Sequence, residues 1–166
     1  MKKIKPIFGC IIVLMAIAIS TISCKENRVY DRFMAVSMDG WERNDTLKFF
    51  VDPQVSGNYQ LALGLRATQR YPYKNVCMII KGEIFSAKNK KRPTNIFSDT
   101  INKSVIDNRG LLVGKKGMTS TEISYPIRTL HLNEKDSLKI EIFHIMAREQ
   151  LTGFSDVGVR LTKVGG

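Results

Sequence analysis

Apolar and polar residues alternate along most of the chain after residue 28. In the clearest stretch, Tyr59, Leu61, Leu63 and Leu65 share one face of an extended chain, and the residues between them share the other. A period of two over such a length is typical of a half-buried β-strand. Similar patterns predict further strands at Thr46–Val51, Val76–Phe85, Ile96–Ile106, Leu111–Val113, Glu122–Ile127, Leu138–Phe143 and Val157–Thr162.

Turn-forming residues separate these segments, for example at Asp52-Pro53, Ser56-Gly57-Asn58 and Asn108-Arg109-Gly110. Only Ala147–Leu151 suggests a turn of helix. About eight strands at this spacing predict an all-β fold with a single antiparallel β-sandwich. The sandwich is either immunoglobulin-like or jelly-roll, because the sequence does not distinguish these two topologies.

The first 23 residues have a different pattern, that of an export signal. Three lysines in the first five residues precede an unbroken run of apolar or small residues at positions 7–19. This run is shorter than the roughly 20 residues that span a bilayer, and it fits the apolar region of a secretory signal. A small residue, Ser23, then precedes Cys24, as at the cleavage site of a bacterial lipoprotein. We therefore predict cleavage before Cys24 and acyl chains on its sulfur.

This processing divides the chain into a signal peptide (1–23), a lipidated tether (24–28) and a β-sandwich domain (29–166). The 143 residues left of the original 166 have the size of one domain. They carry 23 Lys and Arg against 15 Asp and Glu. In an exported protein such positive charge favours lipid phosphates, acidic glycans or acidic proteins as partners, and no nucleic acid is expected.

Residues with the chemistry for catalysis or metal binding are few. His131 and His144 have no His or Cys at ligand spacing, which argues against zinc. His144 continues the apolar face of the segment before it and is expected to be a core histidine. Cys77 lies between Val76 and Met78 and is predicted to be a buried, inert thiol. No nucleophile elbow or phosphate-binding loop occurs, so we expect no enzyme activity, no cofactor and no metal.

Two surface features are candidates for binding. Lys88–Arg92 holds four cations and should form an exposed hairpin tip, either a solvated loop or a contact with anionic lipid or an acidic partner. Lys115 and Lys116 lie between glycines and are expected to be turn residues. Trp41, the only tryptophan, should plug the core or its edge. Alternatively, Trp41 and the Tyr71–Tyr73 loop would offer a stacking surface for sugars.

Several short motifs recur in one order along the chain: Val29-Tyr30-Asp31, Gly40-Trp41, Asp45–Phe49, Asn58-Tyr59, Tyr71–Asn75, Met146-Ala147-Arg148 and Leu151–Gly158. From Val29 to Leu161 the chain thereby resembles the gliding-motility lipoproteins of the GldH type. The resemblance implies an envelope component of surface gliding, and it transfers only Cys24 as a functional residue. Cys24-Lys25-Glu26 also resembles the signal that sends lipoproteins to the cell surface. It has one acidic residue where that signal usually carries two, so the sequence does not decide between the periplasmic and the surface face of the outer membrane.

We therefore expect a non-enzymatic lipoprotein that is anchored in the outer membrane through Cys24. It would be an accessory of a gliding-motility or cell-surface protein machine, with protein partners in the envelope. The rival interpretation is a surface lipoprotein that binds glycans with Trp41 and the Tyr71–Tyr73 loop. An exposed indole beside exposed tyrosines would favour the glycan binder, whereas a buried Trp41 would favour the accessory.

Overall fold

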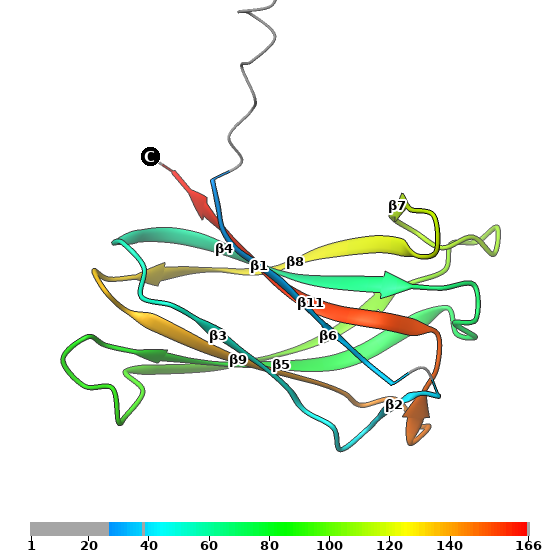
Figure 1. The fold of residues 1–166 in the computed structure, drawn as a ribbon, viewed down its shortest axis with the longest axis horizontal. Helices are drawn as coiled ribbons and strands as arrows, with labels where there is room; N and C mark the ends of the chain where they lie inside the picture. The colour runs from blue at the N-terminus through cyan, green and yellow to red at the C-terminus, as the bar shows by residue number, and fades with distance from the viewer. Residues whose placement is uncertain (1–26, 38, 166) are drawn as a thin grey trace, which may run out of the picture.

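All but one of the segments predicted as strands are strands in the computed structural model, which describes residues 27–37 and 39–165. No helix among these residues is long and apolar enough to cross a membrane. The strands form two stacked antiparallel sheets (Figure 1), so the predicted β-sandwich is confirmed. Their bounds are β1 Arg28–Ala35, β2 Trp41–Glu42, β3 Leu47–Val51, β4 Gly57–Ala67, β5 Asn75–Phe85, β6 Asn95–Ser104, β7 Lys115–Lys116, β8 Thr121–Leu132, β9 Ser137–His144, β10 Gln150–Leu151 and β11 Phe154–Val164.

The strand order identifies the topology as a jelly roll. One sheet has the order β1-β11-β4-β8-β7 and the other β3-β9-β5-β6, while β2 and β10 form a separate pair. Along the chain the long strands mostly alternate between the two sheets, which gives the interlocked Greek keys of a jelly roll. In the immunoglobulin fold, by contrast, the first two strands lie in one sheet and the last two in the other. The structure thus decides between the two predicted topologies.

The core lies between the sheets and is built from the apolar residues of the alternating strands. Both inner faces contribute side chains that are almost fully buried: Leu61, Leu63 and Leu65 of β4, Leu138, Ile140 and Ile142 of β9, and Val157, Val159 and Leu161 of β11. Burying one such side chain contributes about 1.5–3 kcal/mol. The apolar core therefore supplies the main stabilisation of the described domain.

Three local predictions were wrong. Leu111–Val113 forms no strand, only an isolated bridge between Ile106 and Leu112. Ala147–Leu151 contains no helical turn, because Gln150 and Leu151 form β10. Lys115 and Lys116 form the short strand β7 along the edge of β8. Only β10 has a distant partner, β2, about a hundred residues away, whereas the other two segments pair with residues five to seven positions along the chain.

The sandwich has two ends that carry different loops. The start of β1 pairs with the end of β11, which pairs with the start of β4, and the β5–β6 hairpin turns at this same end. We call this the N-terminal end. The opposite end carries the loops at 36–46, 68–74, 105–120 and 145–153, together with the β2–β10 pair (Figure 1).

Candidate functional site

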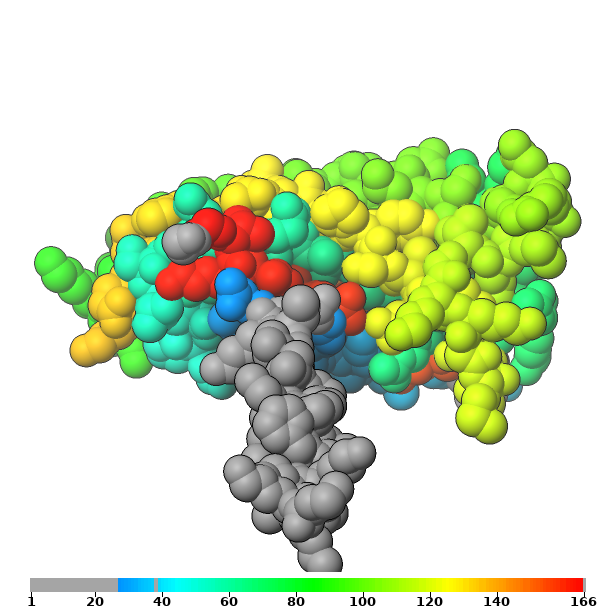
Figure 2. Space-filling model, turned by 90° about the horizontal axis from the view of Figure 1, so that it is seen from above, coloured from blue at the N-terminus to red at the C-terminus, as the bar shows by residue number. Residues whose placement is uncertain are grey.

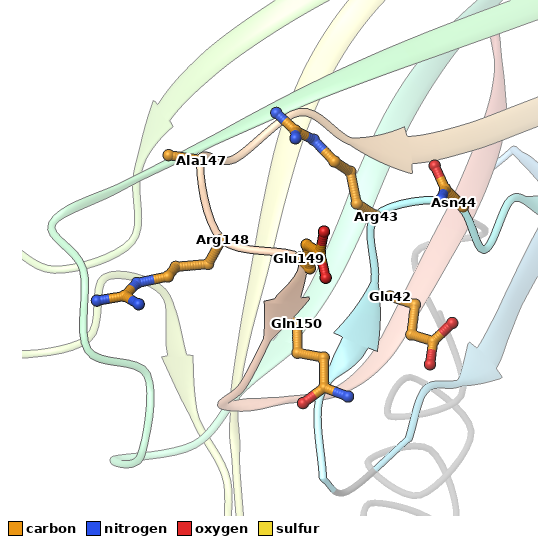
Figure 3. A pocket seen from close by; sticks show the side chains of 7 residues that line it. All are labelled: Glu42, Arg43, Asn44, Ala147, Arg148, Glu149 and Gln150. Carbon is orange, nitrogen blue, oxygen red and sulfur yellow. The ribbon is translucent and has the colours of Figure 1, made fainter.

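A groove of about 910 Å³ lies at the opposite end of the sandwich (Figure 3). Two segments that are about a hundred residues apart form it, because β2 pairs with β10 and the Arg43 amide donates a 2.7 Å hydrogen bond to the Glu149 carbonyl. The turn before β2 needs Gly40, which has φ +135° and leaves no room for a Cβ beside Gln150. The groove is lined by Glu42, Arg43, Asn44, Ala147, Arg148, Glu149 and Gln150.

Trp41 and His144 support this part of the fold from the core side. Trp41 is 0% exposed, and its Nε1 donates a 2.9 Å hydrogen bond to the carbonyl oxygen of Asp45. The Trp41 carbonyl in turn accepts a 2.9 Å hydrogen bond from His144 Nε2. The two rings meet edge to face at a centroid distance of 5.2 Å. The predictions of a core tryptophan and a core histidine are therefore both confirmed.

Burial also determines the protonation state of His144. Its side chain is 0% exposed, and burial lowers its pKa from the ordinary value because the charged imidazolium would lose its water. The proton of the neutral ring lies on Nε2, which faces the Trp41 carbonyl, while Nδ1 has no hydrogen-bond partner among the described residues. His144 is thus a neutral structural residue. Protonation would require either exposing the ring to water or burying a positive charge, and both cost free energy.

The groove itself is polar and carries both signs of charge. Glu42, Arg43, Arg148 and Glu149 are all exposed, and the guanidinium groups of Arg43 and Arg148 extend in different directions (Figure 3). Catalysis would need a nucleophile and a base within hydrogen-bond reach of each other. The groove does not present such a pair, and no group of three or more His, Cys, Asp or Glu that could hold a metal occurs among the described residues. Its mixed charges instead suit the polar rim of a protein contact.

The predicted stacking surface for sugars does not exist, so this expectation was wrong. Trp41 is fully buried, and Tyr71 is only 3% exposed. The Tyr71 hydroxyl donates a 2.8 Å hydrogen bond to the Asn75 carbonyl, and its ring packs against Phe154 at 4.7 Å. Burial raises the pKa of Tyr71 accordingly. Tyr73 is half-buried against Tyr71, so these aromatic rings belong to the core.

Cys77 lies in a strand as predicted, but the prediction that it is buried was wrong. Its neighbours Val76 and Met78 are fully buried on the inner face of β5, and period two therefore directs Cys77 to the outer face. The thiol is a free cysteine of intermediate exposure. Its backbone amide donates a 3.3 Å hydrogen bond to the Met146 sulfur.

Lys88–Arg92 forms the exposed tip of the β5–β6 hairpin, which confirms the prediction. Asn89 holds the turn, because its Oδ1 accepts hydrogen bonds from the Lys91 and Arg92 amides at 3.2 and 3.3 Å. His131 is exposed at the same end of the sandwich, with Nδ1 2.9 Å from Asn58 Oδ1. Neither feature lies near the groove, so the structure does not combine the predicted candidates into one site.

Two of the motifs that carry the family resemblance meet on the outer face of the β1–β11 pair. Arg160 Nε lies 3.1 Å from Asp31, and its Nη2 lies 3.0 Å from Glu122. Beside this ion network, the Phe33 ring covers Gly158, where an added Cβ would come within 2.6 Å of the ring. These residues therefore have structural roles in attaching the first strand to the sheet.

Sequence reasoning missed most of the groove residues. Glu42, Arg43, Asn44, Glu149 and Gln150 were not singled out, and only Ala147 and Arg148 appeared in a motif. The one feature of the sequence that could have pointed to these groove residues is that polar residues flank Gly40-Trp41 and Met146-Ala147-Arg148. The pairing between β2 and β10 that joins them is not visible in one sequence.

Comparison with known proteins gives one family match. The model of the GldH lipoprotein family matches residues 28–161. The gliding motility lipoprotein GldH of Flavobacterium johnsoniae is 26% identical over 157 residues, which cover 90% of this chain and 93% of that protein.

Several solved structures are weakly similar to this chain at low sequence identity. A protein from Sulfurospirillum deleyianum has a TM-score of 0.46 at 11% identity, over 82% of this chain and 99% of that one. A family 35 carbohydrate-binding module from Clostridium thermocellum has a TM-score of 0.38 at 13% identity, over 78% and 89%. A chain of the infectious bursal disease virus particle has a TM-score of 0.40 at 11% identity, over 82% of this chain and 29% of that one. Likenesses at this level have no bearing on function.

Proposed function

Because this chain belongs to the GldH lipoprotein family, we propose that it is an outer-membrane lipoprotein, anchored through acyl chains on Cys24, that serves as a non-enzymatic accessory of a gliding-motility or cell-surface protein machine. The family is one of gliding-motility lipoproteins of the cell envelope. The observation that carries the proposal is the match over residues 28–161, which contains nearly the whole sandwich.

The anchor rests on the sequence, since Cys24 lies outside the described residues. The apolar run at 7–19 ends shortly before Ser23-Cys24, which places the thiol at the membrane surface during export. Each buried CH₂ of an acyl chain contributes about 0.8 kcal/mol, and one chain alone binds only marginally. Two or three chains on Cys24 therefore give lasting attachment.

The accessory role rests on how the reactive groups are used. Trp41 and His144, which might have served binding or chemistry, are both 0% exposed and hold the fold together. The groove above them offers Glu42, Arg43, Arg148 and Glu149 at an exposed rim. Mixed charges on a rigid support favour recognition of another protein, because they give specificity and steer association.

The groove also lies at the opposite end of the sandwich from Asn27, where the anchored tether joins the domain. β8, which runs between the two ends, has 12 residues and is therefore about 40 Å long. A protein partner in the envelope could reach the groove without displacing lipid. We therefore assign the partner contact to the groove.

Site-specific crosslinking in intact cells tests this role. A photoreactive amino acid replaces Arg148 in the groove, and in a matched control it replaces Thr100, which is exposed on the outer face of β6. The accessory role predicts discrete crosslinks to envelope proteins from position 148 and not from position 100. Equal patterns from both positions, or no crosslink from position 148, would contradict it.

A further inference from the structure

The distance between the lipid anchor and the folded domain is limited by chain length. The Asn27 carbonyl accepts a 2.8 Å hydrogen bond from the Lys163 amide, so Asn27 is fixed to the N-terminal end of the sandwich. Cys24 precedes it by three residues, and three residues span no more than about 11 Å. If Cys24 is acylated as proposed above, Asn27 stays within that distance of the lipid headgroups.

The same end of the sandwich presents the most basic loop of the domain. The nine residues from Ser86 to Thr94 contain Lys88, Lys90, Lys91 and Arg92 and no acidic residue. All four cations are exposed, and none takes part in an ion pair among the described residues. In the space-filling view this green loop projects beyond the rest of the molecule (Figure 2).

Two neighbouring loops of the N-terminal end carry charges of both signs and exposed apolar side chains. Glu134 and Lys135 are both exposed in the β8–β9 loop, and the Lys135 amide donates a hydrogen bond to the Gln54 carbonyl in the β3–β4 loop. In that second loop Val55 is 53% exposed, and Val29 at the start of β1 is 40% exposed. Cations combined with single exposed apolar side chains are typical of surfaces that rest at the headgroup level of a membrane.

We propose that the N-terminal end of the sandwich faces the membrane and that the tip formed by Lys88, Lys90, Lys91 and Arg92 binds the phosphate groups of anionic lipids. The inference rests on the proposed acylation of Cys24. The tether fixes the edge of the β1–β11 sheet near the surface, and the tip extends from the other sheet at the same end. Attraction between the four cations and anionic lipid, which acts over about 10 Å at 0.1 M salt, would tilt the tip onto the surface. Attraction of basic segments to anionic lipid needs no specific pocket.

A lipid surface fits the tip better than an acidic protein does. All four charges of the tip have the same sign, which suits the evenly negative surface of an anionic bilayer, whereas the groove carries both signs of charge, which suits a specific protein contact. This orientation also directs the groove with Arg43 and Arg148 away from the membrane. The basic tip and the groove then have separate tasks, one for lipid and one for protein.

Fluorescence quenching in vesicles tests the inference on the mature lipoprotein. A dye is attached to Ala87→Cys, an exposed position beside the tip, in a Cys77→Ser background. The protein is reconstituted into phosphatidylcholine vesicles, with or without phosphatidylglycerol, that contain a nitroxide-labelled headgroup. We expect strong quenching only with the anionic lipid, and loss of quenching in 1 M salt, where the screening length falls to about 3 Å.

Charge reversal supplies a matched pair of variants. Lys90→Glu/Lys91→Glu should abolish the quenching, whereas Lys115→Glu/Lys116→Glu makes the same charge change in exposed lysines at the opposite end and should leave it intact. Both pairs are exposed, so the fold should persist, and a thermal melt of each variant verifies this.

The possible outcomes separate the inference from the proposed function. The membrane contact is overturned if the dye on acylated protein is quenched equally with and without phosphatidylglycerol, or if it is quenched equally in the two charge-reversal variants. If only crosslinking to proteins responds to Lys90→Glu/Lys91→Glu, the tip binds an acidic protein and the lipid assignment is wrong. Mature protein that carries no acyl chains, established by its mass, overturns the anchor and this inference together.

Discussion

Replacing Trp41 with Ala tests whether the indole supports the groove. The side chain is 0% exposed and lies against His144, with a ring-centroid distance of 5.2 Å. Truncating a buried Trp or Phe to Ala costs about 3–5 kcal/mol. The variant also loses the 2.9 Å hydrogen bond from Nε1 to the Asp45 carbonyl, which is about 1 kcal/mol in net terms.

A loss of this size is a large part of the stability of an ordinary domain, which is about 5–15 kcal/mol. The hydrogen bond from His144 Nε2 ends on the Trp41 main chain, so the substitution leaves its acceptor in place. The cavity beside β2 should therefore weaken the β2–β10 pair first and disturb the groove. Urea unfolding followed by circular dichroism measures the change in the free energy of unfolding.

Trp41→Phe is the matched control, because it keeps most of the ring and loses only the Nε1 donor. It should cost about 1 kcal/mol, the net contribution of one hydrogen bond, because Asp45 is exposed and water can pair with its carbonyl. In the unchanged protein, the single indole should fluoresce at short wavelength and should not respond to added oligosaccharides. A loss of less than about 1 kcal/mol in Trp41→Ala, too small for a buried aromatic, or a saccharide-dependent emission, would refute the assignment of Trp41 to the core.

Three further predictions concern single residues. Gly158→Ala should lower the free energy of unfolding by about 1–3 kcal/mol, because its Cβ would lie 2.6 Å from the Phe33 ring; Phe33→Leu should relieve part of this loss in urea unfolding, and a neutral Gly158→Ala would contradict the contact. Burial lowers the pKa of His144 below its ordinary 6.5, so below that pH unfolding takes up a proton. The contribution of His144 to stability is therefore complete above about pH 6.5 and is lost as the pH falls through the lowered pKa. His144→Gln should flatten this dependence of the free energy of unfolding on pH, and an equally steep dependence in the variant would assign it to other groups. The half-exposed Cys77 should react with a small maleimide in the folded protein, as mass spectrometry can show; labelling that requires denaturant would mean that the outer face of β5 is covered.

The sequence allowed the strands to be predicted where polar and apolar residues alternate clearly. β4 is an example, because from Tyr59 to Leu65 every second residue is apolar and the residues between are polar or small, and β9 follows the same pattern from Leu138 to Ile142. The face of Cys77 was misjudged, since Val76 to Ile80 is apolar throughout. The required signal lies further on, where Lys81 and Glu83 show that odd-numbered positions of β5 face outward. The strand was thus predictable, and its orientation was predictable only from its far end.

Features that depend on distant pairing could not be predicted from one sequence. The jelly-roll order follows from which strands pair across the sheets, and both candidate topologies fit the same strand pattern. The groove arises because Arg43 and Glu149 meet across two short strands with no alternation of their own. The tip at Lys88–Arg92 was predictable, because a charged loop between two clear strands is local information.

The mass of the mature N-terminus tests the central claim most directly. The protein is recovered from the outer-membrane fraction of its own cells, and its N-terminal peptide is analysed by mass spectrometry. The account predicts a peptide that begins at Cys24 and carries two or three acyl chains. A Cys24 peptide with a free thiol, or a chain that still contains residues 1–23, would contradict it.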